Sequence, residues 1–344
     1  MDNSSPAREE SKATRSILER HSEFIKANIV LASMALIFFA RPILFGLVPS
    51  ASDLLTIWPV FELGDARVQN MLLSDVVVQS EPWMFFNSFN LQNLQLPLWN
   101  PYCAGGVPHF ANMFFSVFYF PAWPIYIFGV CRYTLLFLYF GKIYLAGASC
   151  YCYLKSVGIK SYPAITGSVA FMFIGFNIVW LYYPPSDLVF ILPLMLYIIE
   201  KVVSSRSNEK YFLALSLLTA TGIVAGFPVM FFHISAVAFA YLIYKLLLSA
   251  PNNAAWVLIE YLFFSALGFA LSAVQLLPAT RNKPGTDLLH SVHPCRERAL
   301  RCAPSRCRRL LAHRQNAPSP RYQHLPTNQG EKPRLFVPVL AFCV

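Results

Sequence analysis

One part of the chain combines a carboxylate, aromatic rings and amides in a pattern suited to binding sugars. Asp75 precedes Gln79 by four residues, and Trp99, Asn100 and His109 follow in an aromatic, proline-rich segment. A carboxylate can take the proton of an acceptor hydroxyl, while aromatic faces stack on sugar rings and amides bind sugar hydroxyls. The alternative interpretation is a solvated loop that its aromatic residues anchor at a membrane surface.

Two charged residues lie within or beside apolar runs. Lys142 is near the middle of the run 132–154, where an ionisable side chain is costly and by default suggests a function. Its ammonium can bind a lipid phosphate as a point charge; alternatively, it snorkels to the membrane surface or pairs with a buried polar group. Asp187 follows Ser186 at the expected outer start of a helix, where it is either a site residue or a helix cap.

The composition excludes an ordinary soluble domain. Hydrophobic residues make up 56% of the 344 residues and charged residues only 13%, with a mean hydropathy of +0.49. Soluble domains carry about 25% charged residues, so the chain is expected to fold in a bilayer. The net charge of +10 does not indicate a nucleic-acid partner, because 12 of the 27 Lys and Arg residues lie after residue 280.

The apolar runs predict an all-α, polytopic transmembrane bundle of about seven spans. The expected spans are 29–49, 132–154, 162–182, 186–200, 211–226, 229–249 and 254–279. Residues 1–28 are a polar cytoplasmic lead, and residues 51–131 are a large external loop with juxtamembrane helices. The apolar stretch 118–130 is short and contains two prolines, so it is predicted to lie in the membrane interface rather than to span.

The placement of Lys and Arg predicts a cytoplasmic N-terminus. The lead carries five of these residues, whereas the segment 51–118 carries only Arg67. Lys155 and Lys160 share one short loop, and Lys201 and Lys210 flank another. Both loops fall on the cytoplasmic side in this orientation, provided that 110–130 does not span.

The composition changes abruptly at residue 281. The tail 281–344 holds 8 of the 25 prolines and half of the eight cysteines, and it has no helical period. Such a sequence is typical of an out-of-frame translation, and a genuine disordered basic tail is the alternative. The spacing C-x6-C-x4-C is not that of a usual zinc site.

These features together resemble the GT-C superfamily of membrane glycosyltransferases, over about residues 29–280. Trp99–Pro108 is similar to a P-x-W-N-P-Y-x-x-G-G-x-P-like pattern of the bacterial YfhO-like branch, and Asp75–Pro82 to its D-x-x-x-Q-x-x-P stretch. Phe227 departs from the histidine that is usual in the Gly-His-Pro motif of that branch. Further similar stretches are Phe171–Phe176, Gly226–Pro228 and Ala273–Pro278.

The resemblance implies a bacterial inner-membrane enzyme that transfers sugar from a polyprenyl-phosphate-linked donor on the extracytoplasmic face. The acceptor would be a glycan, a lipid or a protein, and Asp75 would be the general base. In this interpretation Lys142 holds the donor phosphate, and the other substrate-binding residues are Asp187, Gln79, Trp99, Asn100 and His109.

The same interpretation leaves three points open. A divalent metal is compatible with the chemistry, but no ligand pattern indicates one, and no other cofactor is expected. Family members continue with further spans, so the chain is expected to be a truncated copy. The competing hypotheses are a multi-pass transporter or lipid flippase, and a non-catalytic membrane scaffold.

Overall fold

The computed structural model describes residues 6–281, except for 58–67, 69, 104–105, 116, 205–208, 250 and 252. The described residues are helical or irregular and contain no strand; their one extended pairing is a bridge between Asn100 and Val107. The described residues up to Ala279 form one compact unit. Apart from Arg281, the tail with its predicted out-of-frame origin lies outside the described residues.

Five helical segments are long and apolar enough to cross a membrane, which confirms the helical membrane class. The segments are His21–Phe38, Arg132–Ser156, Ser161–Val179, Pro228–Ser249 and Ala254–Leu271. The first is part of α1 (Pro6–Phe38), and the third comprises α6 (Ser161–Met172) and α7 (Gly175–Val179). The other three are α5, α10 and α11.

Two further helices pack in the same bundle but are shorter. The expected spans 186–200 and 211–226 appear as α8 (Ile191–Ser204) and α9 (Glu209–Val224), of 14 and 16 residues. A spanning helix needs about 20 residues, so seven spans stay a prediction. The helix α8 begins later than expected because Pro184 and Pro185 open a separate 3-10 turn, η7 (Pro184–Leu188).

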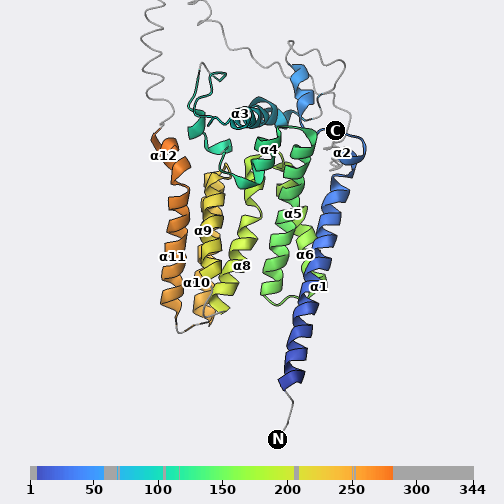
Figure 1. Ribbon diagram of the computed structural model, residues 1–344, viewed down its shortest axis with the longest axis vertical. Coiled ribbons are helices and arrows are strands. Elements are labelled where there is room, and N and C mark those ends of the chain that lie inside the picture. Colours follow the sequence, from blue (N-terminus) through green and yellow to red (C-terminus); the bar gives the residue numbers. More distant parts are fainter. Residues whose placement is uncertain are drawn as a thin grey trace, which may run out of the picture. The chain divides into compact units, whose positions relative to one another are not determined.

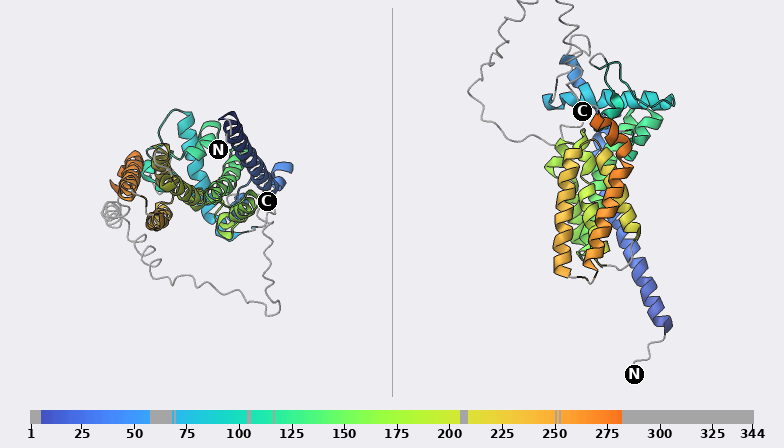
Figure 2. Two further views of the ribbon diagram at one scale, coloured as in Figure 1. Left: turned by 90° about the horizontal axis from the view of Figure 1, so that it is seen from below. Right: turned by 90° about the vertical axis from the view of Figure 1, so that its left-hand side faces the viewer.

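The segment before α5 lies across one end of these helices. Figures 1 and 2 show α3 (Glu81–Gln92) and α4 (Trp123–Phe128) at the end of the bundle where α12 (Ala273–Arg281) also lies. The six residues of α4 are too few to cross a bilayer. Because α5 starts at this end, its last turn and the adjacent loop lie at the opposite end (Figure 1).

The first span differs from the expected run 29–49. The helix α1 extends back to Pro6, so much of the polar lead is helical, and it ends at Phe38. Ala, Arg, Glu and Lys are good helix formers and account for the extension. Pro42, inside the short α2 (Ala40–Leu44), accounts for the end of α1, because its ring would clash with the carbonyl of Phe38.

Glycines allow neighbouring helices to approach closely. A Cβ atom on Gly147 of α5 would lie 2.5 Å from the Met172 side chain of α6. A Cβ on Gly268 of α11 would lie 2.6 Å from the Ser216 carbonyl oxygen of α9. Small residues at such contacts are the usual way in which membrane helices gain packing contacts.

Gly226 provides a first test of this packing. It connects α9 to α10 with φ +100°, and an added Cβ would lie 2.4 Å from the Phe114 carbonyl oxygen. Gly226→Ala is expected to destabilise the fold by about 1–3 kcal/mol, because non-glycine residues are strained in this region of backbone space. Thermal unfolding of the purified chain in detergent measures the change.

Gly141 supplies the matched control. It lies inside α5, and an added Cβ would meet nothing within 4 Å. Gly141→Ala is therefore expected to be neutral or to stabilise by about 0.5–1 kcal/mol through helix propensity. Equal losses in both variants would contradict the close approach of Phe114 to the α9–α10 turn.

Candidate functional site

Lys142 is the centre of a buried polar cluster. It lies on the inward face of α5 and is 8% exposed. Its Nζ lies 3.2 Å from the Leu181 carbonyl oxygen and 3.3 Å from that of Tyr183. Ser186 Oγ is 3.0 Å away and Asp187 Oδ2 is 3.1 Å away. The interpretation of Lys142 as paired with buried polar groups is therefore confirmed, and snorkelling is not observed.

The acceptors come from the irregular backbone between α7 and α8. The helix α7 ends at Val179, and η7 begins at Pro184, so the carbonyls of Leu181 and Tyr183 lie outside regular helix. Ser186 Oγ also donates to these carbonyls, at 3.1 Å and 2.8 Å. The Tyr183 carbonyl also accepts the Ser186 N–H at 3.3 Å, whereas the donors to the Leu181 carbonyl are Lys142 and Ser186 Oγ. Buried carbonyls outside regular helix need such side-chain donors.

Asp187 belongs to the same cluster rather than capping a helix. It lies inside η7, 7% exposed, and η7 has no side-chain cap hydrogen bond. Its Oδ2 pairs with Lys142, whereas its buried Oδ1 has no hydrogen-bond partner. The Tyr119 hydroxyl lies 3.5 Å from the backbone carbonyl oxygen of Asp187. A buried charge is tolerated only when it is paired, so the pair explains why both residues can be buried.

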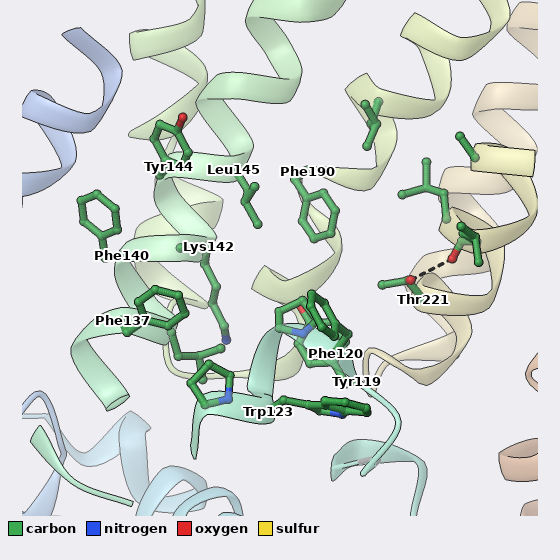
Figure 3. Close-up of a pocket in the computed structure, with 18 of the residues that line it drawn as sticks. Tyr119, Phe120, Trp123, Phe137, Phe140, Lys142, Tyr144, Leu145, Phe190 and Thr221 are labelled. Atoms are coloured by element: carbon green, nitrogen blue, oxygen red, sulfur yellow. Dashed lines mark hydrogen bonds between the residues drawn. The ribbon is translucent and has the colours of Figure 1, made fainter. Parts of the chain in front are cut away.

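A large apolar cavity reaches this cluster. Its volume is about 930 Å³, and Lys142 is the one charged residue in its lining. The lining comes from η6 (Phe120–Ala122), α4, α5, α8 and α9. Figure 3 shows the Lys142 side chain extending toward the end of the cavity where Tyr119, Phe120 and Trp123 lie. The cavity thus combines an apolar body with one cationic residue near the α4 end.

Asp75 lies at the same end of the bundle and is exposed. It directly precedes η3 (Val76–Ser80), on which Gln79 is also exposed. The hydroxyl of Tyr183 donates to the Leu72 carbonyl oxygen at 2.7 Å. Burial raises the pKa of Tyr183, and the nearby carboxylate of Asp75 raises it further. Tyr183 therefore links Asp75 to the backbone that binds Lys142.

Trp99 and Asn100 form a separate platform on the outer segment. Asn100 pairs with Val107 through backbone bonds of 2.8 Å and 2.9 Å, and its Oδ1 accepts from the Tyr102 amide. Trp99 is 56% exposed, and a Cβ on Gly106 would lie 2.6 Å from its indole ring. Gly106 therefore lets the indole lie flat against the turn while a large part of it faces solvent.

His109 lies inside the outer segment, 3% exposed. Its Nε2 is 2.9 Å from Asn87 Oδ1 of α3, and its ring packs edge-on against Phe86. Burial lowers the pKa of His109 from 6.5 to about 4. The residue is thus neutral near pH 7 and joins α3 to the loop that follows Trp99, instead of facing a substrate from water.

A second buried ion pair was not expected from the sequence. Glu200 of α8, 5% exposed, lies 2.9 Å from Lys245 Nζ of α10 and accepts from the Tyr241 hydroxyl. Tyr153 of α5 donates to Tyr241 at 3.3 Å. Both residues lie inside or at the end of apolar runs in the sequence. That position could have indicated that their charges are buried against a partner. The cluster joins three helices near the end of the bundle opposite α4.

The described residues offer no grouping of three His, Cys, Asp or Glu side chains that could hold a metal ion. At the buried cluster, the one carboxylate is beside the ammonium of Lys142. Divalent Mg²⁺ or Ca²⁺ prefers several oxygen ligands, and an adjacent cation opposes binding. This donor set does not fit a divalent metal.

The ion pair predicts that substitutions of Lys142 and Asp187 have non-additive effects on stability. Lys142→Met leaves the Asp187 carboxylate buried without its partner, which is expected to cost about 3–5 kcal/mol. Lys142→Met combined with Asp187→Leu removes both charges and is expected to restore most of that stability. Unfolding in detergent of the wild type, Lys142→Met, Asp187→Leu and the double variant gives the coupling energy. A single variant as stable as the wild type would contradict the pairing.

His109 predicts a pH dependence of the outer segment. Because its pKa is lower in the folded than in the unfolded state, the unfolded chain binds more protons between pH 6.5 and about 4. Stability is therefore complete above pH 6.5 and falls by roughly 3 kcal/mol as the pH drops toward 4. Limited proteolysis of the outer segment against pH measures the loss.

Two variants separate this effect from general acid unfolding. His109→Gln is expected to flatten the pH dependence, because glutamine does not titrate. His233→Gln, on an exposed face of α10, is expected to keep the wild-type profile. Identical profiles for the two variants would contradict the assignment to His109.

Comparison with known proteins does not assign the chain to a family. No protein-family model matches the chain, and no curated protein or solved structure matches it. The apolar cavity, the buried Lys142–Asp187 pair and the outer segment are the observations on which a function rests.

Proposed function

We propose that the chain is a membrane glycosyltransferase that uses a polyprenyl-phosphate-linked sugar donor on the extracytoplasmic face. The observation that carries this proposal is the apolar cavity of about 930 Å³ with the single cation Lys142 in its lining. An isoprenoid tail needs an apolar channel, and a phosphate needs a cation near the end of that channel. The resemblance of Asp75–Pro82 and Trp99–Pro108 to the YfhO-like branch supports the same assignment.

The cavity is long enough for part of an isoprenoid tail. Along α9 the lining runs from Tyr211 to Thr221, and ten residues of helix rise about 15 Å. The hydrocarbon core of a bilayer is about 30 Å thick, so this length is about half of it. The tail would enter from the outer leaflet, with its phosphate toward Tyr119 and Trp123.

Asp75 is proposed as the general base. Its exposed carboxylate would take the proton of the acceptor hydroxyl as that oxygen attacks the anomeric carbon of the donor sugar. The bond from this carbon to the phosphate oxygen breaks, and the polyprenyl phosphate leaves with the electron pair. Gln79 and Trp99, whose side chains are exposed, would bind the sugar or the acceptor, whereas Asn100, 3% exposed and bonded to the Tyr102 amide, would support Trp99 from within the turn.

The proposed membrane topology has seven spans and a cytoplasmic N-terminus in a bacterial inner membrane. Lys155 and Lys201 lie in the last turns of α5 and α8, and Lys210 lies in the first turn of α9. These three residues thus belong to one end of the bundle, opposite the segment that carries Asp75. Cytoplasmic loops collect Lys and Arg, so this end is assigned to the cytoplasm and residues 51–131 to the outside.

A transporter or lipid flippase is the second candidate. The Glu200–Lys245 pair favours it, because it adds a second ion pair with a buried carboxylate between helices of the bundle. The apolar lining of the main cavity argues against a path for a polar solute, since Lys142 is the only charged residue in that lining. If the chain transfers sugar but does not move lipid from one leaflet to the other, the transferase is favoured over the flippase.

Two variants test the transferase directly. Asp75→Asn removes the base and is expected to lower sugar transfer by about 10²–10⁴-fold, with normal membrane insertion. Gly141→Leu is expected to block the tail, because Gly141 lines the cavity and has open space beside it. Transfer of radiolabelled sugar from a polyprenyl-phosphate donor in membranes measures both effects.

The control is Glu260→Gln, which removes one carboxylate whose indole partner, Trp256, is on the same helix, α11. It is expected to transfer sugar at the wild-type rate. Near-wild-type transfer by Asp75→Asn would overturn the role of the base. Unchanged transfer by Gly141→Leu would overturn the role of the cavity.

A further inference from the structure

The ammonium of Lys142 has no donor left over. It carries three N–H groups, and four acceptors surround it: the carbonyls of Leu181 and Tyr183, Ser186 Oγ and Asp187 Oδ2. A lipid phosphate therefore cannot simply be added to this arrangement. It must replace one of the acceptors that are already present.

The four acceptors differ in how firmly they are held. The two carbonyls belong to the backbone around η7, and Ser186 Oγ is tied to both of them at 3.1 Å and 2.8 Å. The carboxylate of Asp187 is held by side chains alone, with Lys142 on Oδ2 and the Tyr119 hydroxyl close by. Rotation of this side chain changes no backbone hydrogen bond. Asp187 is thus the acceptor that can leave Lys142 without rearranging the backbone, provided that its carboxylate is neutralised as it leaves.

Charge balance points to the same residue. Lys142 and Asp187 together are neutral, so an added phosphate would bring a second anion to a site with one cation. Two like charges about 5 Å apart weaken binding by about a hundredfold at an effective dielectric constant of about 20. A cavity of about 20 Å³, whose lining includes Lys142, Asp187, Tyr119 and Tyr126, lies at the pair and gives the carboxylate room to turn toward the Tyr119 hydroxyl.

We propose that Asp187 is a resident counter-anion of Lys142, and that the phosphate of a lipid-linked substrate displaces it. The inference rests on the proposed function, in which the donor is a lipid phosphate. It adds a description of how the phosphate of that donor gains access to Lys142. The empty site is kept neutral by Asp187. The loaded site is neutral when the displaced carboxylate takes up a proton from water, which leaves the phosphate as the anion paired with Lys142. Uncharged lipids can fill the apolar cavity but cannot displace the carboxylate, so the exchange selects phosphorylated lipids.

The test is a binding measurement on the purified full chain in detergent. The probes are farnesyl phosphate and farnesol, which share an isoprenoid tail and differ in the anionic group. Asp187→Asn keeps the shape of the side chain and an oxygen acceptor for Lys142 but removes the competing charge. It is expected to bind farnesyl phosphate about 10–100-fold more tightly than the wild type, with farnesol binding unchanged.

Glu260→Gln is the matched control for loss of one negative charge and is expected to bind both probes as the wild type does. The double variant Lys142→Met with Asp187→Leu is expected to lose the preference for the phosphate. A ratio of phosphate to alcohol affinity that does not rise in Asp187→Asn would overturn the exchange. So would a phosphate preference that persists in the double variant.

Failure of the exchange and failure of the proposed function are distinguishable. If Asp75→Asn abolishes sugar transfer while Asp187→Asn leaves phosphate binding unchanged, the transferase stands and the exchange is wrong. If Asp187→Asn tightens phosphate binding while Asp75→Asn transfers sugar normally, the exchange stands and Asp75 is not the base.

Discussion

The buried pair of Lys142 and Asp187 is the interaction on which the rest of the site depends. It joins α5 to η7, the turn that leads into α8, and both helices line the apolar cavity. The same ammonium binds the Leu181 and Tyr183 carbonyl oxygens in the break between α7 and α8. Removing either charge would therefore disturb the turn, the entry to α8 and one wall of the cavity together.

The pair also relates the cavity to the outer segment. The backbone of Tyr183 binds Lys142, while its hydroxyl binds the Leu72 carbonyl oxygen close to Asp75. Tyr119, which precedes η6, lies against Asp187 and lines the cavity. An exposed carboxylate, a buried cation and an apolar channel thus occur in one continuous region. This continuity, more than any single residue, favours chemistry on a lipid-linked substrate.

The sequence predicted the membrane-helical class, and it predicted a buried polar partner as one alternative for Lys142, because charge is rare in apolar runs and costly at bilayer depth. It did not predict that Lys142 meets Asp187, since the two residues are 45 positions apart and their contact depends on how α5 packs against the turn before α8. Nor did it place the end of the first span, because average hydropathy does not register the effect of Pro42 on the preceding turn.

The outer segment shows a further limit of sequence patterns. Trp99, Asn100 and His109 are close in sequence, but Trp99 faces solvent and His109 is buried against Asn87. A motif specifies which residue types occur and not which of them face outward. Glu200 and Lys245 show the same limit for charges, because helix packing brings them together from α8 and α10.

The central claim is that the cavity takes the tail of a lipid whose phosphate lies beside Lys142. Photo-crosslinking with a polyprenyl phosphate that carries a diazirine on its tail, followed by peptide mapping, tests this claim most directly. We expect adducts on cavity-lining residues such as Phe137 of α5, Leu217 of α9 and Phe190, which directly precedes α8. Adducts confined to the outward faces of α10 and α11 would contradict it.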